Sequence, residues 1–159
     1  MEAYKRLEVE SEDGLDVSTF PPDRLAGDID GAKQAMFSLP GSAYSAPVLS
    51  WVRPPAVTAI GFVADARLGP ASRNTAWFGT VLTDSLLRYN VAPDGRSLAL
   101  DGPLSDRVDD NESKGDLGES ESNVVGTGFG IVTDIDQGPD GSLYVVSLDS
   151  GNVYRISVR

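Results

Sequence analysis

The apolar residues of this chain gather in short runs of four to eight positions, and each run is bounded by Gly, Pro, Asp or Asn. The runs are rich in β-branched and aromatic side chains, and the residues between them are typical of hairpin turns. This pattern predicts an all-β chain with strands at 35–39, 48–51, 58–63, 75–82, 85–91, 97–100, 131–136, 143–148 and 153–158.

The strands near the C-terminus are apolar on both faces. In the run 143–148, Leu143 and Val145 lie on one side of the strand, and Tyr144, Val146 and Leu148 lie on the other. A strand with two apolar faces belongs to a sheet that is covered on both sides.

An internal repeat indicates how these strands are grouped. The run 86–91 superimposes on 153–158 at an offset of 67 residues. Removal of the 22 residues of the acidic stretch 101–122 leaves 45, close to the ~40–50 residues of a propeller blade. We therefore predict a partial β-propeller of about two antiparallel four-stranded blades over residues 36–159, with an acidic loop at 101–122.

Blades bury their faces against neighbours around a ring, so two blades alone leave both outer faces uncovered.

The negative charge of the chain is concentrated in two segments. The whole sequence has 24 acidic and 13 basic residues, a net charge of −11. Residues 1–35 hold nine acids and four bases, and residues 101–122 hold eight acids and two bases. Both segments are poor in apolar residues, so we expect a poorly ordered acidic leader at 1–35 and a solvated loop at 101–122.

Composition also excludes several partners and chemistries. The acidic balance argues against nucleic acid and against a basic membrane-surface helix. The sequence has no Cys and no His, which excludes disulfides, thiolate zinc sites, imidazole ligands and Ser-His-Asp catalysis.

The sequence contains no apolar run of the ~18 residues that a membrane span needs. Charged residues follow Met1 without an apolar run behind them, so no secretory signal is predicted. As written the chain would stay in the cytoplasm, although its cellular location is otherwise unknown.

Two groups of carboxylates could suggest calcium. Asp134, Asp136 and Asp140 alternate along the chain, but Val145 occupies the place of the bidentate Glu of an EF-hand-type loop. We interpret these acids as strand-end and turn residues that accept local backbone hydrogen bonds. The second group has Lys114 where a calcium loop needs its turn Gly and is interpreted as a mobile acidic loop; it comprises Asp109, Asp110, Asn111, Glu112, Asp116 and Glu119.

Two further features have ordinary explanations. The glycine-rich stretch 126–130 leads into a strand rather than a helix, so a phosphate cradle would lack its helix dipole and its Lys. The aromatic side chains are expected to pack within blades rather than to form sugar platforms; they are Tyr44, Trp51, Trp77, Tyr89, Tyr144 and Tyr154.

Three stretches, taken in order, carry a family resemblance. They are LPGSAYSAPVLSW at 39–51, TAIGF and WFG at 58–62 and 77–79, and FGIVTDI, GPDGSLYV and GNVYRI within 129–156. They resemble a late blade, the next two strands and the closing blade of the glucose/sorbosone dehydrogenase family, the soluble quinoprotein sugar dehydrogenases. The resemblance implies a six-bladed propeller that binds pyrroloquinoline quinone (PQQ) and calcium and oxidises sugars by hydride transfer, usually in the periplasm or outside the cell.

The chain departs from the family pattern at its chemical positions. The family's catalytic base is a His from an early blade, and this sequence has none. The cofactor-facing arginines of the family correspond to Ile131 and Thr133, which lead into Asp134 and cannot bind carboxylates as a guanidinium would. We therefore expect no catalytic, cofactor-binding or metal-binding residues here, and no cofactor for this chain. Whether it is an enzyme is left open.

Two hypotheses follow. In the first, the chain is a C-terminal fragment or truncated member of a sugar-dehydrogenase-like propeller and is not competent alone. In the second, it is a non-catalytic propeller-type interaction module that completes its sheet packing by oligomerisation or by binding a partner chain. Both predict association with missing blades or with copies of itself, and neither involves nucleic acid or membrane.

Overall fold

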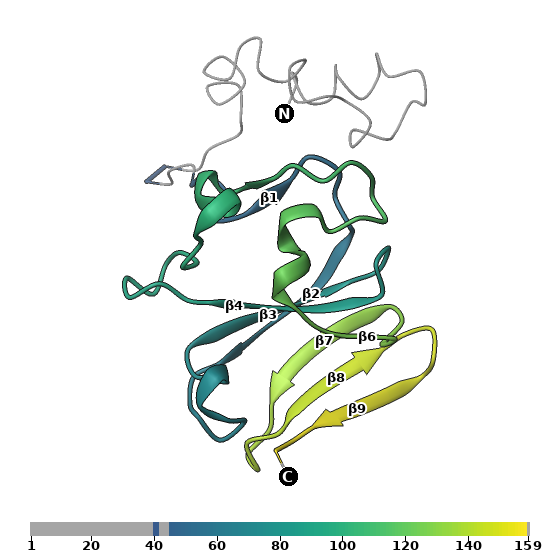
Figure 1. Ribbon diagram of the computed structural model, residues 1–159. Helices are drawn as coiled ribbons and strands as arrows, with labels where there is room; N and C mark the ends of the chain where they lie inside the picture. Colours follow the sequence, from purple (N-terminus) through teal and green to yellow (C-terminus); the bar gives the residue numbers. More distant parts are fainter. Residues whose placement is uncertain (1–39, 42–44, 159) are drawn as a thin grey trace. The chain divides into compact units, whose positions relative to one another are not determined.

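The computed structural model describes residues 40–41 and 45–158. One compact unit comprises Val48–Arg159 (Figure 1). The predicted leader at 1–35 and the predicted strand at 35–39 lie outside the described residues. Within them the chain is all-β, as predicted: it has two antiparallel sheets, a short parallel pair of strands, three 3-10 segments and no α-helix. None of its described helices is long and apolar enough to cross a membrane.

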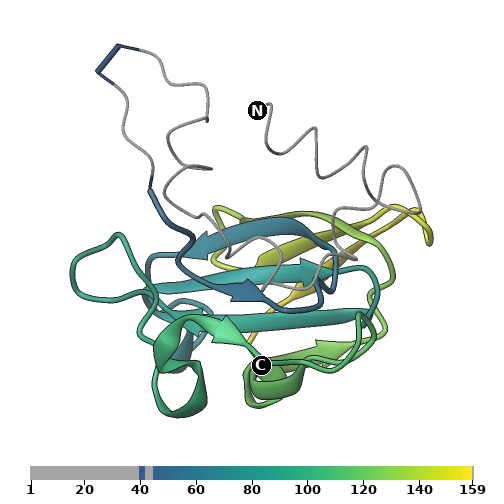
Figure 2. The same ribbon diagram turned by 90° about the horizontal axis from the view of Figure 1, so that it is seen from above.

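The first sheet has four antiparallel strands in the order β2-β3-β4-β6, which lie side by side in Figure 2. They are β2 (Val57–Val63), β3 (Thr75–Thr80), β4 (Ser85–Asn90) and β6 (Val124–Thr127). The first three match predicted strands. The fourth, β6, matches no predicted strand; the sequence indicated a strand at 97–100 instead.

Residues 97–100 form no strand, and that prediction is wrong. They contribute a single bridge, between Val91 and Leu98. The preceding turn is closed by Asp94, whose Oδ1 accepts hydrogen bonds from the backbone N–H groups of Arg96 and Ser97. Leu98 and Leu100 then pack against one face of the sheet rather than along its edge. The edge position is left to β6, so the acidic segment is an insertion within the first blade and does not follow it.

The second sheet has three antiparallel strands among the described residues, in the order β7-β8-β9. They are β7 (Val132–Gln137), β8 (Leu143–Ser147) and β9 (Asn152–Ile156), each at a predicted position. The sheet repeats the pairing of the first. Ala59 pairs with Gly79 and Gly79 with Leu86, just as Asp134 pairs with Val146 and Val146 with Val153. Both first strands also have a register shift at their second residue. The two sheets are thus two copies of one blade pattern.

The sheets pack face to face through their first strands. Gly61 and Gly79 lie where the sheets approach most closely, because a Cβ at Gly79 would lie 2.5 Å from Cβ of Val132, and a Cβ at Gly61 would collide with the carbonyl oxygen of Ile135. The Thr58 hydroxyl also donates to the Val132 carbonyl. The core between the sheets is formed by Ala59, Val63, Leu68, Trp77, Leu86, Val132, Ile135, Leu143 and Val145.

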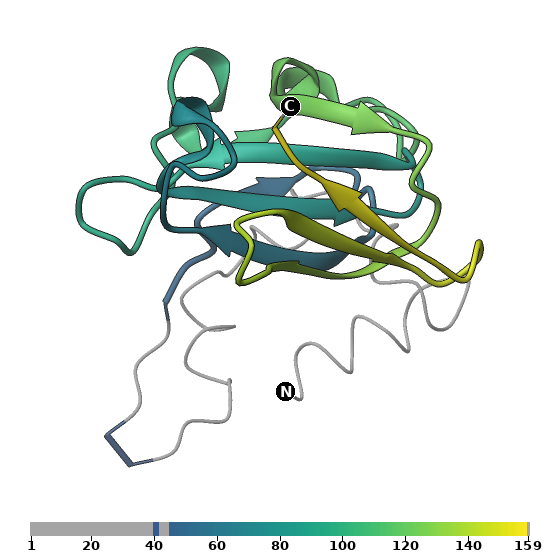
Figure 3. The same cartoon turned by 90° about the horizontal axis from the view of Figure 1, so that it is seen from below.

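The opposite face of the first sheet is partly covered by the acidic segment (Figure 3). This segment contains η4 (Gly102–Asp106), β5 (Val108–Asp109) and η5 (Gly118–Asn123), and β5 pairs in parallel with β1 (Ser50–Trp51). Leu104 and Leu117 are buried against the sheet. The prediction of a solvated loop is therefore wrong here, because two leucines spaced among the acids are enough to anchor the segment to the apolar sheet.

The close approach of the sheets predicts a specific sensitivity. Gly79→Ala should destabilise the fold by about 1–3 kcal/mol, since overpacking forces neighbouring backbone to shift. Gly115→Ala is the matched control: Gly115 has an ordinary φ and open space around its Cα, so its replacement should change the free energy of unfolding by less than about 0.5 kcal/mol. Urea unfolding of both variants measures the difference, and equal stabilities would contradict the packing described.

Candidate functional site

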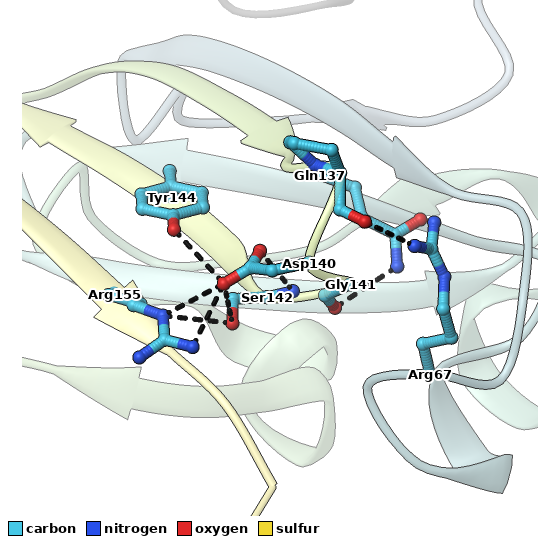
Figure 4. A network of polar contacts seen from close by, with 8 residues as sticks. Arg67, Gln137, Asp140, Gly141, Ser142, Tyr144 and Arg155 are labelled. Carbon is cyan, nitrogen blue, oxygen red and sulfur yellow. Dashed lines mark hydrogen bonds and ion pairs between the residues drawn. The ribbon is translucent and has the colours of Figure 1, made fainter.

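The densest polar network in the second sheet surrounds Asp140, in the turn between β7 and β8 (Figure 4). Its Oδ1 accepts from the Ser142 backbone N–H at 3.0 Å. Its Oδ2 accepts from the Ser142 hydroxyl at 2.9 Å and the Tyr144 hydroxyl at 3.1 Å. Arg155 on β9 completes the group, with Nη2 2.9 Å and Nε 3.1 Å from Oδ2.

These donors set the ionisation of the carboxyl. The backbone hydrogen bond from Ser142 contributes most, and together with the Ser142 and Tyr144 hydroxyls and Arg155 it lowers the pKa of Asp140 to about 2. A carboxylate that ionises so readily is a poor proton acceptor at neutral pH. Asp140 is therefore suited to holding the turn against β8 and β9 rather than to acid–base chemistry.

A second part of the network joins this turn to the first sheet. Arg67, in the loop after β2, donates from Nη1 to the Pro139 carbonyl at 2.7 Å and from Nε to Asp65 at 2.8 Å. Gln137 donates from Nε2 to Asp65 and to the Gly141 carbonyl, each at 3.3 Å. The backbone N–H of Arg67 is the main cause of a lowered pKa at Asp65. The network thus fastens one end of the two-sheet sandwich.

The other alternating acids behave as the sequence indicated. Asp134 accepts from the Ile135 N–H at 2.9 Å, and Asp136 accepts from the Gln137 N–H at 2.8 Å. Each of these carboxylates serves its own stretch of backbone. Among the residues that the structure describes, no three carboxylates come together as a metal site.

The acidic segment contains two buried polar residues whose role the sequence did not reveal. Asp109 accepts from the backbone N–H and the hydroxyl of Ser120, and from the Glu119 N–H at 3.3 Å. Asn111 exchanges hydrogen bonds with the backbone of Arg53, at 2.9 Å to its Oδ1 and 2.6 Å from its Nδ2. Both are fully enclosed, so they organise the segment from within. In the sequence these two residues belong to the stretch Asp109-Asp110-Asn111, which was considered for calcium. Nothing in that stretch distinguishes the buried Asp109 and Asn111 from the exposed Asp110.

Backbone N–H groups of the glycine-rich stretch 126–130 also form hydrogen bonds within the chain. The N–H groups of Gly128 and Gly130 donate to the carbonyl and the carboxylate of Asp84, at the turn before β4. The Gly128 amide thus binds the Asp84 backbone and the Gly130 amide binds the Asp84 carboxylate, both within the chain.

The aromatic side chains mostly pack, as expected. Trp77 is buried in the core between the sheets, and Tyr89 is buried on the opposite face of the first sheet, beside Leu104 and Leu117. Burial raises the pKa of Tyr89 to about 12. Tyr154 packs edge-on to Phe129, with ring centroids 5.3 Å apart. Trp51 is partly buried against the same cluster as Tyr89, and Tyr144 belongs to the Asp140 network. Tyr44 lies outside the described residues.

The positions at which the resemblance would place cofactor-facing arginines do not fit PQQ. Ile131 uses its N–H and carbonyl to bind Asp149 and Leu148 within the sheet, and its side chain is aliphatic. Thr133 is exposed at the bulge of β7 and carries no charge. Beside them Asp134 adds a negative charge, which would repel the carboxylates of the quinone. These residues offer no cationic site for the cofactor.

Comparison with known proteins gives partial matches. No protein-family model and no curated protein sequence matches the chain. Among solved structures it is similar to a glucose dehydrogenase, with 16% identity and a TM-score of 0.47 over 72% of this chain and 29% of that one. A second glucose dehydrogenase structure gives 20% identity and 0.46, over 77% and 28%. The apo-form of the soluble aldose sugar dehydrogenase from Escherichia coli gives 24% and 0.46, over 77% and 31%. The chain spans about three tenths of the length of each.

The buried carboxylate of the acidic segment can be tested directly. Asp109→Ala leaves the buried donors of Ser120 and Glu119 without an acceptor and should lower the free energy of unfolding by about 2 kcal/mol or more. Asp110→Ala, at the exposed neighbouring position, should have an effect below about 0.5 kcal/mol. Thermal and urea unfolding would detect the contrast, which a truly solvated loop would not give.

The Asp140 network predicts an acid titration. The carboxyl should titrate with a pKa of about 2 by carbon-13 NMR, and Ser142→Ala should raise this value toward the ordinary 3.8 by removing one donor. Because the folded-state pKa is depressed, the stabilisation is complete above pH 3.8 and is lost as the pH falls through about 2. Asp94, in an equivalent exposed turn without Arg155, serves as an internal reference. An Asp140 pKa near 3.8 in the unmodified chain would contradict the network.

Proposed function

We propose that this chain is a two-blade portion of a sugar-dehydrogenase-like propeller, and that it contributes blade packing rather than chemistry. The observation that carries the proposal is the stacking of two equivalent sheets through their first strands, with apolar side chains left on the outward faces. Ile60 and Phe62 on β2 are 52% and 60% exposed, and Val153 on β9 is 63% exposed. Such faces are normally covered by further blades.

The three sequence stretches that resemble the glucose/sorbosone dehydrogenases support the same reading. In complete members of that family, sugar oxidation depends on PQQ, calcium and a His base. The residues of this chain supply no His, and Ile131 and Thr133 stand at the arginine positions. On this proposal, sugar oxidation requires blades that the chain does not itself contain, and neither PQQ nor calcium binds to it alone.

The second candidate is a non-catalytic interaction module of propeller type. The exposed apolar side chains of β2 and β9 favour it as well, since contiguous apolar surface marks an interaction site. The two candidate functions predict different behaviour of the purified chain. A module forms a defined assembly with a cooperative melting transition, whereas an incomplete portion binds hydrophobic dyes strongly and associates into mixed sizes.

Cofactor titration tests the absence of a quinone site. PQQ added to the purified chain in the presence of calcium should cause no saturable change in its absorbance or in protein fluorescence, and aldoses should not reduce an electron-acceptor dye. A complete soluble glucose dehydrogenase treated in the same way is the positive control. A submicromolar dissociation constant for PQQ would contradict the proposal.

A further inference from the structure

The second sheet repeats the first, but among the described residues it lacks a fourth strand. The first sheet is completed by β6, which pairs antiparallel with β4 and places Gly126 opposite Leu86. The pairing of the central strands makes β9 the equivalent of β4, and Val153 the equivalent of Leu86. In the part of the chain that the structure describes, no strand pairs with the other side of β9, which lies at the margin of its sheet (Figure 1). The repeat therefore marks the β9 edge as the place of a further strand.

The backbone at this edge has hydrogen-bonding groups that no described strand uses. At the end of β8, the Leu148 N–H donates to the carbonyl just before β7. Consecutive residues of an antiparallel ladder alternate between their two neighbours, so Val145 faces β9 and forms a hydrogen-bonded pair with Tyr154. The same alternation in β9 turns the N–H and C=O groups of Val153 and Arg155 away from β8, toward the open edge.

β9 also lacks the features by which edge strands avoid pairing. Of the four outer strands in the two described sheets, β2, β6 and β7 have a register shift in their pairing, whereas β9 pairs with β8 without one. The one charged residue of β9, Arg155, is bound to Asp140 at 2.9 Å. Val153 is 63% exposed. Because bulges, free charges and proline normally block edge-to-edge pairing, β9 is the edge best suited to accept a strand.

The side chains on the inner face of β9 are less covered than their equivalents on β4. Leu87 and Tyr89 are 0% and 3% exposed. The residues at the same positions of β9, Tyr154 and Ile156, are half-buried at the border of the core between the sheets. In the first sheet, Val124 of β6 packs against the cluster that contains Leu87. A strand on β9 with an apolar residue at the position of Val124 would cover Tyr154 in the same way.

We propose that the β9 edge binds an extended segment of a partner polypeptide as an antiparallel fourth strand. β6 defines the chemistry of this segment: it is uncharged, with a β-branched apolar residue opposite Tyr154 and a small residue opposite Val153. Main-chain hydrogen bonds provide the binding, and the apolar residue provides selectivity. This strand addition rests on the proposed two-blade function and specifies where, and in which direction, a further propeller portion joins the second sheet.

Amide hydrogen exchange of the dilute full chain, read by mass spectrometry with electron-transfer fragmentation, tests the proposal. The probe is a synthetic peptide that copies residues 122–128, which include β6. Without peptide, the Val153 and Arg155 amides should exchange as fast as those of an exposed loop, and the Tyr154 amide should be protected. Millimolar peptide should slow exchange at Val153 and Arg155 by about tenfold or more.

Two results of this experiment would overturn the proposal. One is unchanged exchange at Val153 and Arg155 when the peptide is added. The other is protection of these amides in the chain alone, because the edge would then already have an occupant, either a segment of the same chain or a second copy.

Two modifications separate backbone pairing from other modes of binding. Val153→Pro removes the free N–H without breaking a bond to β8, since proline is tolerated where an edge strand faces solvent, and it should abolish the protection at Arg155. Val153→Thr keeps the N–H and the β-branched shape, so it should bind like the unmodified chain. Circular dichroism checks that both variants keep their sheet. Undiminished binding by a folded Val153→Pro chain would contradict strand addition.

A modified peptide gives the same test without altering the protein. An N-methyl group on the residue copied from Gly126 removes the donor that lies opposite Val153, so this peptide should not protect the edge. Protection by the N-methyl peptide, or peptide-induced changes confined to β2, β4 or β7, would overturn the assignment of the edge. These outcomes leave the proposed two-blade function standing, because the cofactor titration tests it separately.

Discussion

The close contact between the first strands of the two sheets is the constraint on which the structure depends. Gly61 and Gly79 bring the backbone of the first sheet against Ile135 and Val132 of the second. Native interiors are packed as densely as organic crystals, so this contact fixes the separation of the sheets. Bulges at equivalent positions of β2 and β7 let the Thr58 hydroxyl reach the Val132 carbonyl. The core between the sheets and the network around Asp140 both require this separation.

Much of this arrangement was predictable because it depends on local periodicity. The runs of β2, β3, β4, β7, β8 and β9 are strongly apolar and end at turn residues, and the offset between 86–91 and 153–158 identified the repeat. The position of the fourth strand was not predictable in this way. The runs 97–100 and 124–127 compete for the edge of β4, and Leu98 and Leu100 are drawn to the face of the sheet. That choice is made by tertiary packing, which single-sequence patterns do not contain.

The acidic segment illustrates a different limit of sequence reasoning. Eight acids in 22 residues predict solvation, yet Leu104, Leu117 and Asp109 are buried, and Asp109 accepts hydrogen bonds from three donors. A buried carboxylate is tolerated when hydrogen bonds replace its hydration. Composition averages over the segment and so cannot identify the one acid that folds inward. The same averaging concealed the role of Asn111, which joins the segment to the backbone of Arg53.

Glycine and charged residues are distributed unequally between equivalent positions of the two sheets. The first sheet has two glycines, Gly61 and Gly79, on the face that packs against the second sheet. The second sheet places Asp136 and Val146 at the equivalent positions, and its neighbouring Asp134 and Arg155 are exposed. Hydrated charges and added side-chain volume both oppose the approach of another sheet. The two outward faces therefore differ: that of the first sheet carries the exposed apolar Ile60 and Phe62, and that of the second combines exposed Val153 with charged side chains.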